Sequence, residues 1–154
     1  GARPMAPGYG LVWVEQHPLP TGARWMQDIG LRDGAELLST LQQFDCARAV
    51  VHGHIHHQFE RAVGRDRIDD HEFESEVIDA RVDHQVERQG RGSLAVLGTP
   101  STCVQFAPHS EDFAVDARQP GYRWFRLHAD GSFETGVERV GAGSFEPETS
   151  GGGY

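Results

Sequence analysis

The residues AVVHGHIHH, 49–57, join a short apolar run to a glycine and four histidines. Residues 47–51 have the composition of a buried strand in a parallel sheet. Histidines two positions apart at the end of a strand point to the same side, and a preceding glycine lets the backbone turn closely around a ligand. Because α/β proteins bind ligands outside the carboxyl ends of such strands, the pattern predicts a metal site at His54 and His56.

The residues before this motif predict a βαβ-like unit. Residues 11–14 predict a strand, and 17–22 predict a loop because prolines lack backbone donors. Asp33 and Glu36 predict the start of a helix with a reciprocal cap, followed by an apolar helix face. This helix leads into the histidine-bearing strand, so histidines follow both strands of the unit. We expect these histidines to meet in space.

The residues after the motif predict an insertion, further strands and a hairpin. The charge-dense residues 61–91 predict an exposed, partly helical insertion. Extended segments are expected at 94–97 and 103–106, on either side of a hydroxyl-rich turn, and an antiparallel hairpin is expected over 121–140. We divide the chain into a flexible amino terminus, one domain that contains the insertion, and a flexible tail. Their bounds are 1–10, 11–140 and 141–154.

Composition limits the partners and the compartment of the protein. The chain has 154 residues and a formal net charge of −9, which fits one domain or part of a larger one. The negative charge argues against binding nucleic acid or an anionic membrane surface. Its two cysteines lie far apart in the sequence, which indicates reduced thiols and a cytoplasmic protein, and no apolar run approaches a membrane span. The missing initial methionine suggests a partial chain.

Four motifs occur in an order typical of one enzyme family. They are Trp25-Met26 with Ile29-Gly30-Leu31, then Gly53-His54-Ile55-His56, then residues 99–106, then residues 120–124. Together they resemble the carboxyl half of bacterial class III cyclic-nucleotide phosphodiesterases, which belong to the calcineurin-like metallophosphoesterases. The resemblance implies an α/β fold, namely part of an α/β/β/α sandwich with a mixed sheet and a C-terminal antiparallel hairpin.

The resemblance also implies a reaction and a metal requirement. The family binds two divalent ions of manganese, iron or zinc, and its Gly-His-x-His supplies one histidine to each, here His54 and His56. A metal-bound hydroxide attacks the phosphorus of a phosphodiester such as 3',5'-cyclic AMP, and both metals polarise the phosphoryl oxygens. By contrast, we expect His52 to be hydrogen-bonded within the strand and His57 to face solvent.

A third ligand and the substrate contacts are less directly matched. Members usually carry His-His-Pro-Pro-Leu-Pro near residues 15–20, and the earlier histidine binds metal. Alignment without a gap places Glu15 at the ligand position, whereas a one-residue deletion places His17 there. Arg24 is a candidate phosphate contact. The hydroxyls of the turn either bind substrate or shape the turn through bonds to the backbone, and these candidates are Thr99, Ser101 and Thr102.

Other readings remain open at this point. The family's amino-terminal motifs, an Asp-x-His pair, a bridging aspartate and an Asn-His segment, do not occur before Leu11. Three imidazoles cannot hold two ions, so the isolated chain is expected to be inactive. One alternative is a non-catalytic fragment that pairs with a missing amino-terminal half or with a second copy through open sheet edges. A cupin-like site for one metal at His54, His56 and Glu60 is a weaker alternative.

Overall fold

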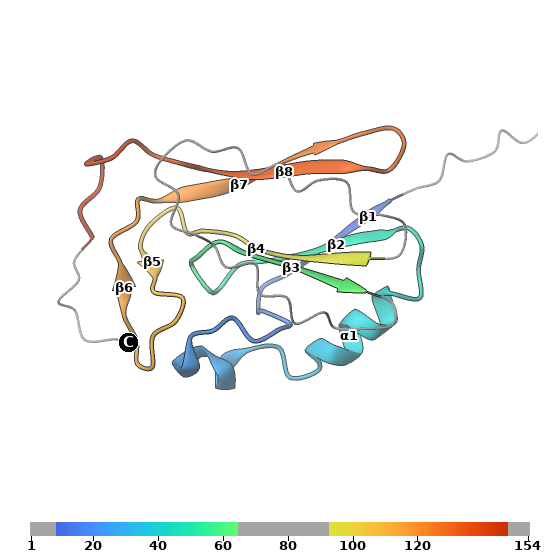
Figure 1. Cartoon of the computed structure of the whole chain (residues 1–154), viewed down its shortest axis with the longest axis horizontal. Helices are drawn as coiled ribbons and strands as arrows, with labels where there is room; N and C mark the ends of the chain where they lie inside the picture. The colour runs from blue at the N-terminus through green and yellow to red at the C-terminus, as the bar shows by residue number, and fades with distance from the viewer. Residues whose placement is uncertain (1–8, 65–92, 148–154) are drawn as a thin grey trace, which may run out of the picture.

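A computed structural model describes residues 9–64 and 93–147. These residues form a mixed α/β structure with one mixed sheet and two antiparallel hairpins (Figure 1). The elements are β1 (Gly10–Val14), η1 (Arg24–Ile29), α1 (Gly34–Leu41), β2 (Ala47–His52), β3 (Phe59–Gly64), β4 (Ser93–Gly98), β5 (Gln105–Phe106), β6 (Val115–Asp116), β7 (Gly121–Leu127) and β8 (Phe133–Arg139).

The main sheet has the strand order β1-β2-β4-β3. Strands β1, β2 and β4 are parallel, and β3 is antiparallel to β4. Val14 pairs with His52 and His52 pairs with Gly98, so the three parallel strands end side by side. The predicted βαβ-like unit is confirmed, because α1 joins the parallel strands β1 and β2. The residues that follow these strands therefore leave the sheet from one edge.

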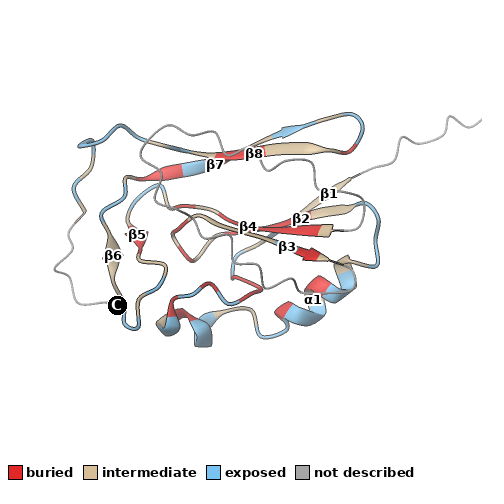
Figure 2. Cartoon of the chain, viewed as in Figure 1, coloured by how far each residue is buried: buried red, intermediate tan, exposed pale blue. Residues whose placement is uncertain are grey.

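Two layers cover the two faces of this sheet. Helix α1 and η1 lie on one side and the β7–β8 hairpin lies on the other (Figure 1). Leu38 of α1 packs with Val50 and Val96, whereas Phe125 and Phe133 of the hairpin pack on the opposite set of sheet residues, Ala49, Ala95 and Leu97. Successive strand residues alternate between the faces, so both faces of β2 and β4 are buried (Figure 2).

Several boundaries differ from the sequence expectations. Asp33 is the residue before α1, but its side chain makes no capping hydrogen bond, so the prediction of a reciprocal cap is wrong. The Gly34 amide instead donates a hydrogen bond to the Leu31 carbonyl in the preceding loop. Residues 61–64 continue β3, and the rest of the expected insertion lies outside the described residues. The residues of β3 do not alternate clearly between apolar and polar side chains, so the sequence did not predict this strand.

Both ends of the described chain form hydrogen bonds with the rest of the domain. Gly10 already belongs to β1 and donates to the Cys46 carbonyl at 2.7 Å. Near the tail, the Gln119 amide donates to the Phe145 carbonyl at 2.8 Å and accepts from the Phe145 amide at 3.0 Å. The part of the expected tail that is described, 141–147, is therefore tied to the domain. In the described part of the chain no helix is both long and apolar enough to span a membrane.

Candidate metal centre

The loop from β2 to β3 carries the two predicted ligands in an unusual backbone conformation. His54 has a φ of 65° and His56 has a φ of 51°. Both residues lie beyond the last residue of β2, so strand alternation does not orient them. The sequence argument for a common side was wrong in this respect, and the left-handed conformation falls on the histidines rather than on Gly53. Non-glycine residues adopt this conformation rarely and at a cost, often at functional sites.

Ile55 anchors the loop between these histidines. Its side chain is fully buried and packs with Met26 and Phe106. Its amide donates to the Gly53 carbonyl at 2.7 Å, which closes a three-residue turn. The turn fixes the backbone at His54, and the buried Ile55 side chain anchors the residue between the two histidines.

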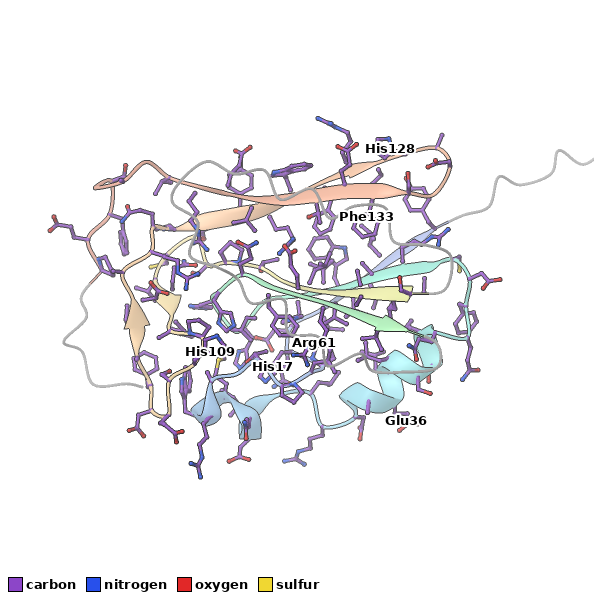
Figure 3. All side chains as sticks on the ribbon, in the orientation of Figure 1. His17, Glu36, Arg61, His109, His128 and Phe133 are labelled. Carbon is purple, nitrogen blue, oxygen red and sulfur yellow. The ribbon has the colours of Figure 1, made fainter. Side chains whose placement is uncertain are left out.

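His17 joins this loop from the end of β1. Its side chain is only 3% exposed, and its ring centroid lies 6.0 Å from that of His54 and 6.4 Å from that of His52. The His17 and His54 rings are nearly parallel, at 15°. Figure 3 shows His17 below the sheet, on the side of η1 and α1, far from His128 in the hairpin turn. The expectation that histidines after both strands meet in space is confirmed.

His56 is placed differently from the other two candidates. Its ring lies flat on Phe106, with centroids 4.2 Å apart and planes at 12°. The Phe106 amide also donates to the His56 carbonyl at 3.2 Å. Within 9–64 and 93–147, no three His, Cys, Asp or Glu side chains form a group that could hold a metal ion. The structure thus brings His17 and His54 together and leaves His56 beside them on an aromatic face.

Two imidazoles of this region are tied to backbone carbonyl groups through Nδ1. Nδ1 of His52 lies 3.2 Å from the Gly53 carbonyl oxygen, and Nδ1 of His57 lies 2.9 Å from that of Ile55. One nitrogen of each imidazole is buried without a hydrogen-bond partner. These atoms are Nδ1 of His17, Nε2 of His52, Nε2 of His54, Nδ1 of His56 and Nε2 of His57. A histidine that binds metal typically has its second ring nitrogen tied in this way.

Burial keeps several of these rings uncharged. It lowers the pKa of His52 and of His57 to about 4, and it is also the main cause of the lowered pKa of His17 and of His56. Metal binding needs the neutral ring. His57 is 3% exposed, so the expectation that it faces solvent is wrong. The neutral donors with unpartnered nitrogens fit a divalent cation by type, although no described trio is preformed.

Glu15 adds a carboxylate to this group of imidazoles. It directly follows β1, and its Oε1 lies 3.3 Å from Nδ1 of His54. Val14 and His52 are paired neighbours, so the residues that follow them emerge together. Sequence alignment raised Glu15 only as one of two alternatives, because alignment alone does not show which side chain reaches His54.

The substrate candidates occupy more ordinary positions. Arg24 forms an exposed ion pair with Glu111 at 2.9 Å. The Thr99 hydroxyl donates to the His52 carbonyl at 3.3 Å, and the Ser101 hydroxyl accepts from the Cys103 amide at 3.0 Å. Thr102 is exposed. The hydroxyls of Thr99 and Ser101 therefore shape the turn, as the alternative interpretation expected, and their role toward substrate stays a prediction.

The cupin-like alternative loses support from the position of Glu60. Its carboxylate is engaged by Arg123, with Oε1 at 2.9 Å from Nη2. The two histidines of that motif lie in a loop beside a mixed α/β sheet rather than on a barrel strand. The geometry therefore favours a metal site at the carboxyl ends of the parallel strands over a cupin-like site that includes Glu60.

Comparison with known proteins finds cyclic-nucleotide phosphodiesterases among the relatives of the chain. It is 40% identical over 144 residues to the 3',5'-cyclic adenosine monophosphate phosphodiesterase CpdA of Pseudomonas aeruginosa, a match covering 94% of this chain and 43% of that relative. The CpdA protein of Escherichia coli K12 is 34% identical over 144 residues, covering 94% of this chain and 42% of that protein. The chain is homologous to the carboxyl-terminal part of these phosphodiesterases.

A more distant cyclic-nucleotide phosphodiesterase matches as well. The 3',5'-cyclic-nucleotide phosphodiesterase alr5338 of Nostoc is 28% identical over 130 residues, covering 84% of this chain and 38% of that relative. No protein-family model matches the chain. The chain spans less than half the length of the curated cyclic-nucleotide phosphodiesterases that it matches. The resemblance drawn from the sequence motifs is confirmed.

Proposed function

We propose that this chain is the histidine-bearing part of a metal-dependent phosphodiesterase that hydrolyses 3',5'-cyclic AMP. The observation that carries the proposal is the gathering of imidazoles, each with one buried and unpartnered nitrogen, at the carboxyl edge of the parallel strands. The names of the relatives support the substrate class.

His54 and His56 would each help to hold one of two divalent ions of manganese, iron or zinc, and His17 would assist His54. Bound ions of this kind supply positive charge that stabilises the phosphoryl and leaving oxygens of a phosphodiester. The buried aromatic face under His56 and the turn at Ile55 keep the imidazoles in place before any ion binds. Preorganised ligands lose little entropy on binding.

The layers of the described structure support the proposed α/β/β/α sandwich. Helix α1, the main sheet and the β7–β8 hairpin stack in that order. Strand β1 is one edge of the main sheet as described. We propose that the remaining part of the family fold pairs at this edge, and pairing with a second copy stays an alternative prediction.

A second candidate is a metal-binding part that hydrolyses nothing by itself. The observation that favours the absence of hydrolysis is that the described residues group no three side chains for one ion, so they do not supply the full ligand set of a two-metal centre. Both candidates require the chain to bind metal, and they differ in whether cyclic AMP is consumed.

The test is a metal titration of the chelator-treated chain with Mn²⁺, Fe²⁺ and Zn²⁺, followed by a chromatographic assay for 5'-AMP formed from 3',5'-cyclic AMP. We expect bound metal in the wild type and its loss in the double variant His54→Ala/His56→Ala. Metal binding with 5'-AMP formation supports the phosphodiesterase, and metal binding without it supports the second candidate. Metal content that is unchanged in the double variant, or absent from the wild type, would contradict both.

A further inference from the structure

The loop between β2 and β3, residues 53–58 and here called the histidine loop, crosses the end of a third strand. Strand β4 lies between β2 and β3 in the sheet, and its last residue, Gly98, pairs with both His52 and Phe59. His52 is the last residue of β2, and Phe59 is the first residue of β3. The histidine loop therefore passes over Gly98 on its way from one strand to the other.

Gly98 is in close contact with this loop. A Cβ at Gly98 would lie 2.6 Å from Cδ1 of Ile55 and 3.1 Å from Cε1 of His52, so both side chains pack directly against the glycine backbone. Ile55 is the residue between the two proposed ligands. The residue after Gly98, Thr99, donates from its amide to the His52 carbonyl at 2.9 Å. The end of β4 therefore supports the histidine loop through both packing and a backbone hydrogen bond.

A buried arginine of the β7–β8 hairpin holds the Gly98 carbonyl. Nε and Nη2 of Arg123 both donate to this oxygen, at 3.3 Å and 3.1 Å. Nη2 also donates to Glu60 at 2.9 Å, and Nη1 donates to the Thr135 hydroxyl oxygen at 3.3 Å. That hydroxyl is itself fixed, because it donates to the Trp124 carbonyl at 2.7 Å. The guanidinium thus has partners on β3, β4 and β8.

From this arrangement, we propose that Arg123 is a positioning residue for the histidine loop: it fixes the Gly98 carbonyl, and Gly98 in turn fixes Ile55 between the two imidazoles. The inference rests on the proposed metal-dependent function and gives that site a support outside the loop itself. Arg123 acts through the end of β4 and contacts neither metal nor substrate.

The cost of burying a charge favours a positioning role over a purely stabilising one. The Arg123 side chain is fully enclosed, and taking a guanidinium out of water is costly even beside a carboxylate. Apolar residues of similar volume often stabilise a protein core as well as a buried ion pair does. They cannot donate two hydrogen bonds from one planar group whose orientation a carboxylate fixes. The guanidinium therefore specifies the position of the Gly98 carbonyl in a way that apolar packing does not.

Amide hydrogen exchange of the metal-free chain, followed by NMR, tests the positioning directly. The two reporter amides are that of Ile55, which donates to the Gly53 carbonyl, and that of Thr99. We expect Arg123→Met to speed the exchange of both by about tenfold or more relative to amides in the centres of β2 and β4. The matched control Arg126→Met changes an arginine of the same strand that is 68% exposed, and it should leave both reporters as in wild type.

A destabilised control separates positioning from a general loss of stability. Leu38 is buried in α1, on the face of the sheet opposite the hairpin, and Leu38→Ala lowers the free energy of unfolding by opening a cavity. Global unfolding exposes every amide, so this variant should have no selective effect on the two reporters. A selective effect in Arg123→Met alone supports the proposal. No selective effect, or the same one in Leu38→Ala, overturns it. If Arg123→Met does not fold, Arg123→Lys takes its place under the same criteria, because lysine keeps the charge but lacks the planar pair of donors.

Metal affinity then tests the link to the proposed function. The chelator-treated variants are titrated with Mn²⁺ by isothermal titration calorimetry, at a temperature where circular dichroism shows each of them to be folded. We expect Arg123→Met to weaken binding about tenfold, and both controls to bind as wild type does. Equal affinities of Arg123→Met and wild type overturn the role of Arg123 at the metal site. A wild type that binds no Mn²⁺ overturns the proposed function, while the exchange comparison still decides whether Arg123 positions the loop.

Discussion

Nη2 of Arg123 lies 2.9 Å from Oε1 of Glu60, which joins the β7–β8 hairpin to strand β3. The Arg123 side chain is fully enclosed, and the same Nη2 donates to the Gly98 carbonyl at 3.1 Å. Gly98 ends β4 and pairs with His52, so this arginine reaches the edge of the sheet that carries the proposed metal ligands. The hairpin therefore stabilises the site from the face opposite α1.

Replacing Arg123 with methionine should lower the free energy of unfolding by about 3 kcal/mol. The change removes the partner of Glu60 and leaves the Gly98 carbonyl without this donor, while the methionine keeps most of the apolar bulk. Urea denaturation followed by fluorescence measures the loss.

Arg126 provides the matched control for this prediction. It lies on the same strand and pairs with Glu134 at 3.0 Å, but its side chain is 68% exposed. An exposed ion pair contributes at most about 1 kcal/mol, so Arg126→Met should change stability far less. If both variants lose the same stability, the Arg123 pair has no special role.

Most of the fold was predictable because its signals are local. The apolar run at residues 47–51, the proline-rich loop and the alternating hairpin each predicted an element that the structure contains. Strand β3 was hidden because its only fully buried residue is Val63, so it lacks a clear apolar pattern.

The sequence predicted which residues are candidates for the site, but it did not predict how they are arranged. The histidine motif named the candidate residues, but it gave the wrong reason for their orientation, since both have positive φ values and lie in a loop beyond β2. The approach of Glu15 to His54 depends on the register between β1 and β2. Register is set by residues far apart in the chain and could not be read from this single sequence.

Backbone strain at His54 predicts opposite effects of glycine and alanine. At a φ of 65°, His54→Gly removes the strain and His54→Ala retains it, so the glycine variant should be more stable by about 1 kcal/mol. Gln16, an exposed loop residue without a positive φ, should show the reverse order. Thermal and urea unfolding of the four variants provide the measurement, and a glycine variant at position 54 that is less stable than its alanine partner would refute the idea.

Gly30 predicts how sensitive the site is to the position of His17. A Cβ at Gly30 would lie 2.8 Å from Nε2 of His17, so Gly30→Ala must displace the buried imidazole. We expect a loss of about 1–3 kcal/mol of stability and weaker binding of Mn²⁺.

Gly53→Ala is the contrasting variant in the histidine loop. The nearest heavy atom to its added Cβ is the Glu15 carbonyl oxygen at 3.9 Å, an ordinary contact. Its stability should stay within about 1 kcal/mol of wild type, because the methyl group makes only this ordinary contact. Equal losses in both variants would show that the spacing around His17 does not control the site.

The buried imidazoles predict that the metal-free protein loses stability in mild acid. Burial lowers the pKa of His52 and of His57 to about 4 in the folded chain, whereas both titrate near the ordinary value of 6.5 when unfolded. Between these values the unfolded chain binds more protons, so the free energy of unfolding falls as the pH falls from 6.5 toward 4. The stabilisation is complete above pH 6.5, and each ring accounts for up to about 3 kcal/mol of the loss.

Urea unfolding in chelator at pH 7.5, 6.5, 5.5 and 4.5 measures how steeply the free energy of unfolding depends on pH for wild type and for His52→Gln. Because glutamine does not titrate, the variant should show a shallower slope by about one proton, and identical slopes would mean that His52 is protonated in the folded state as readily as in the unfolded chain.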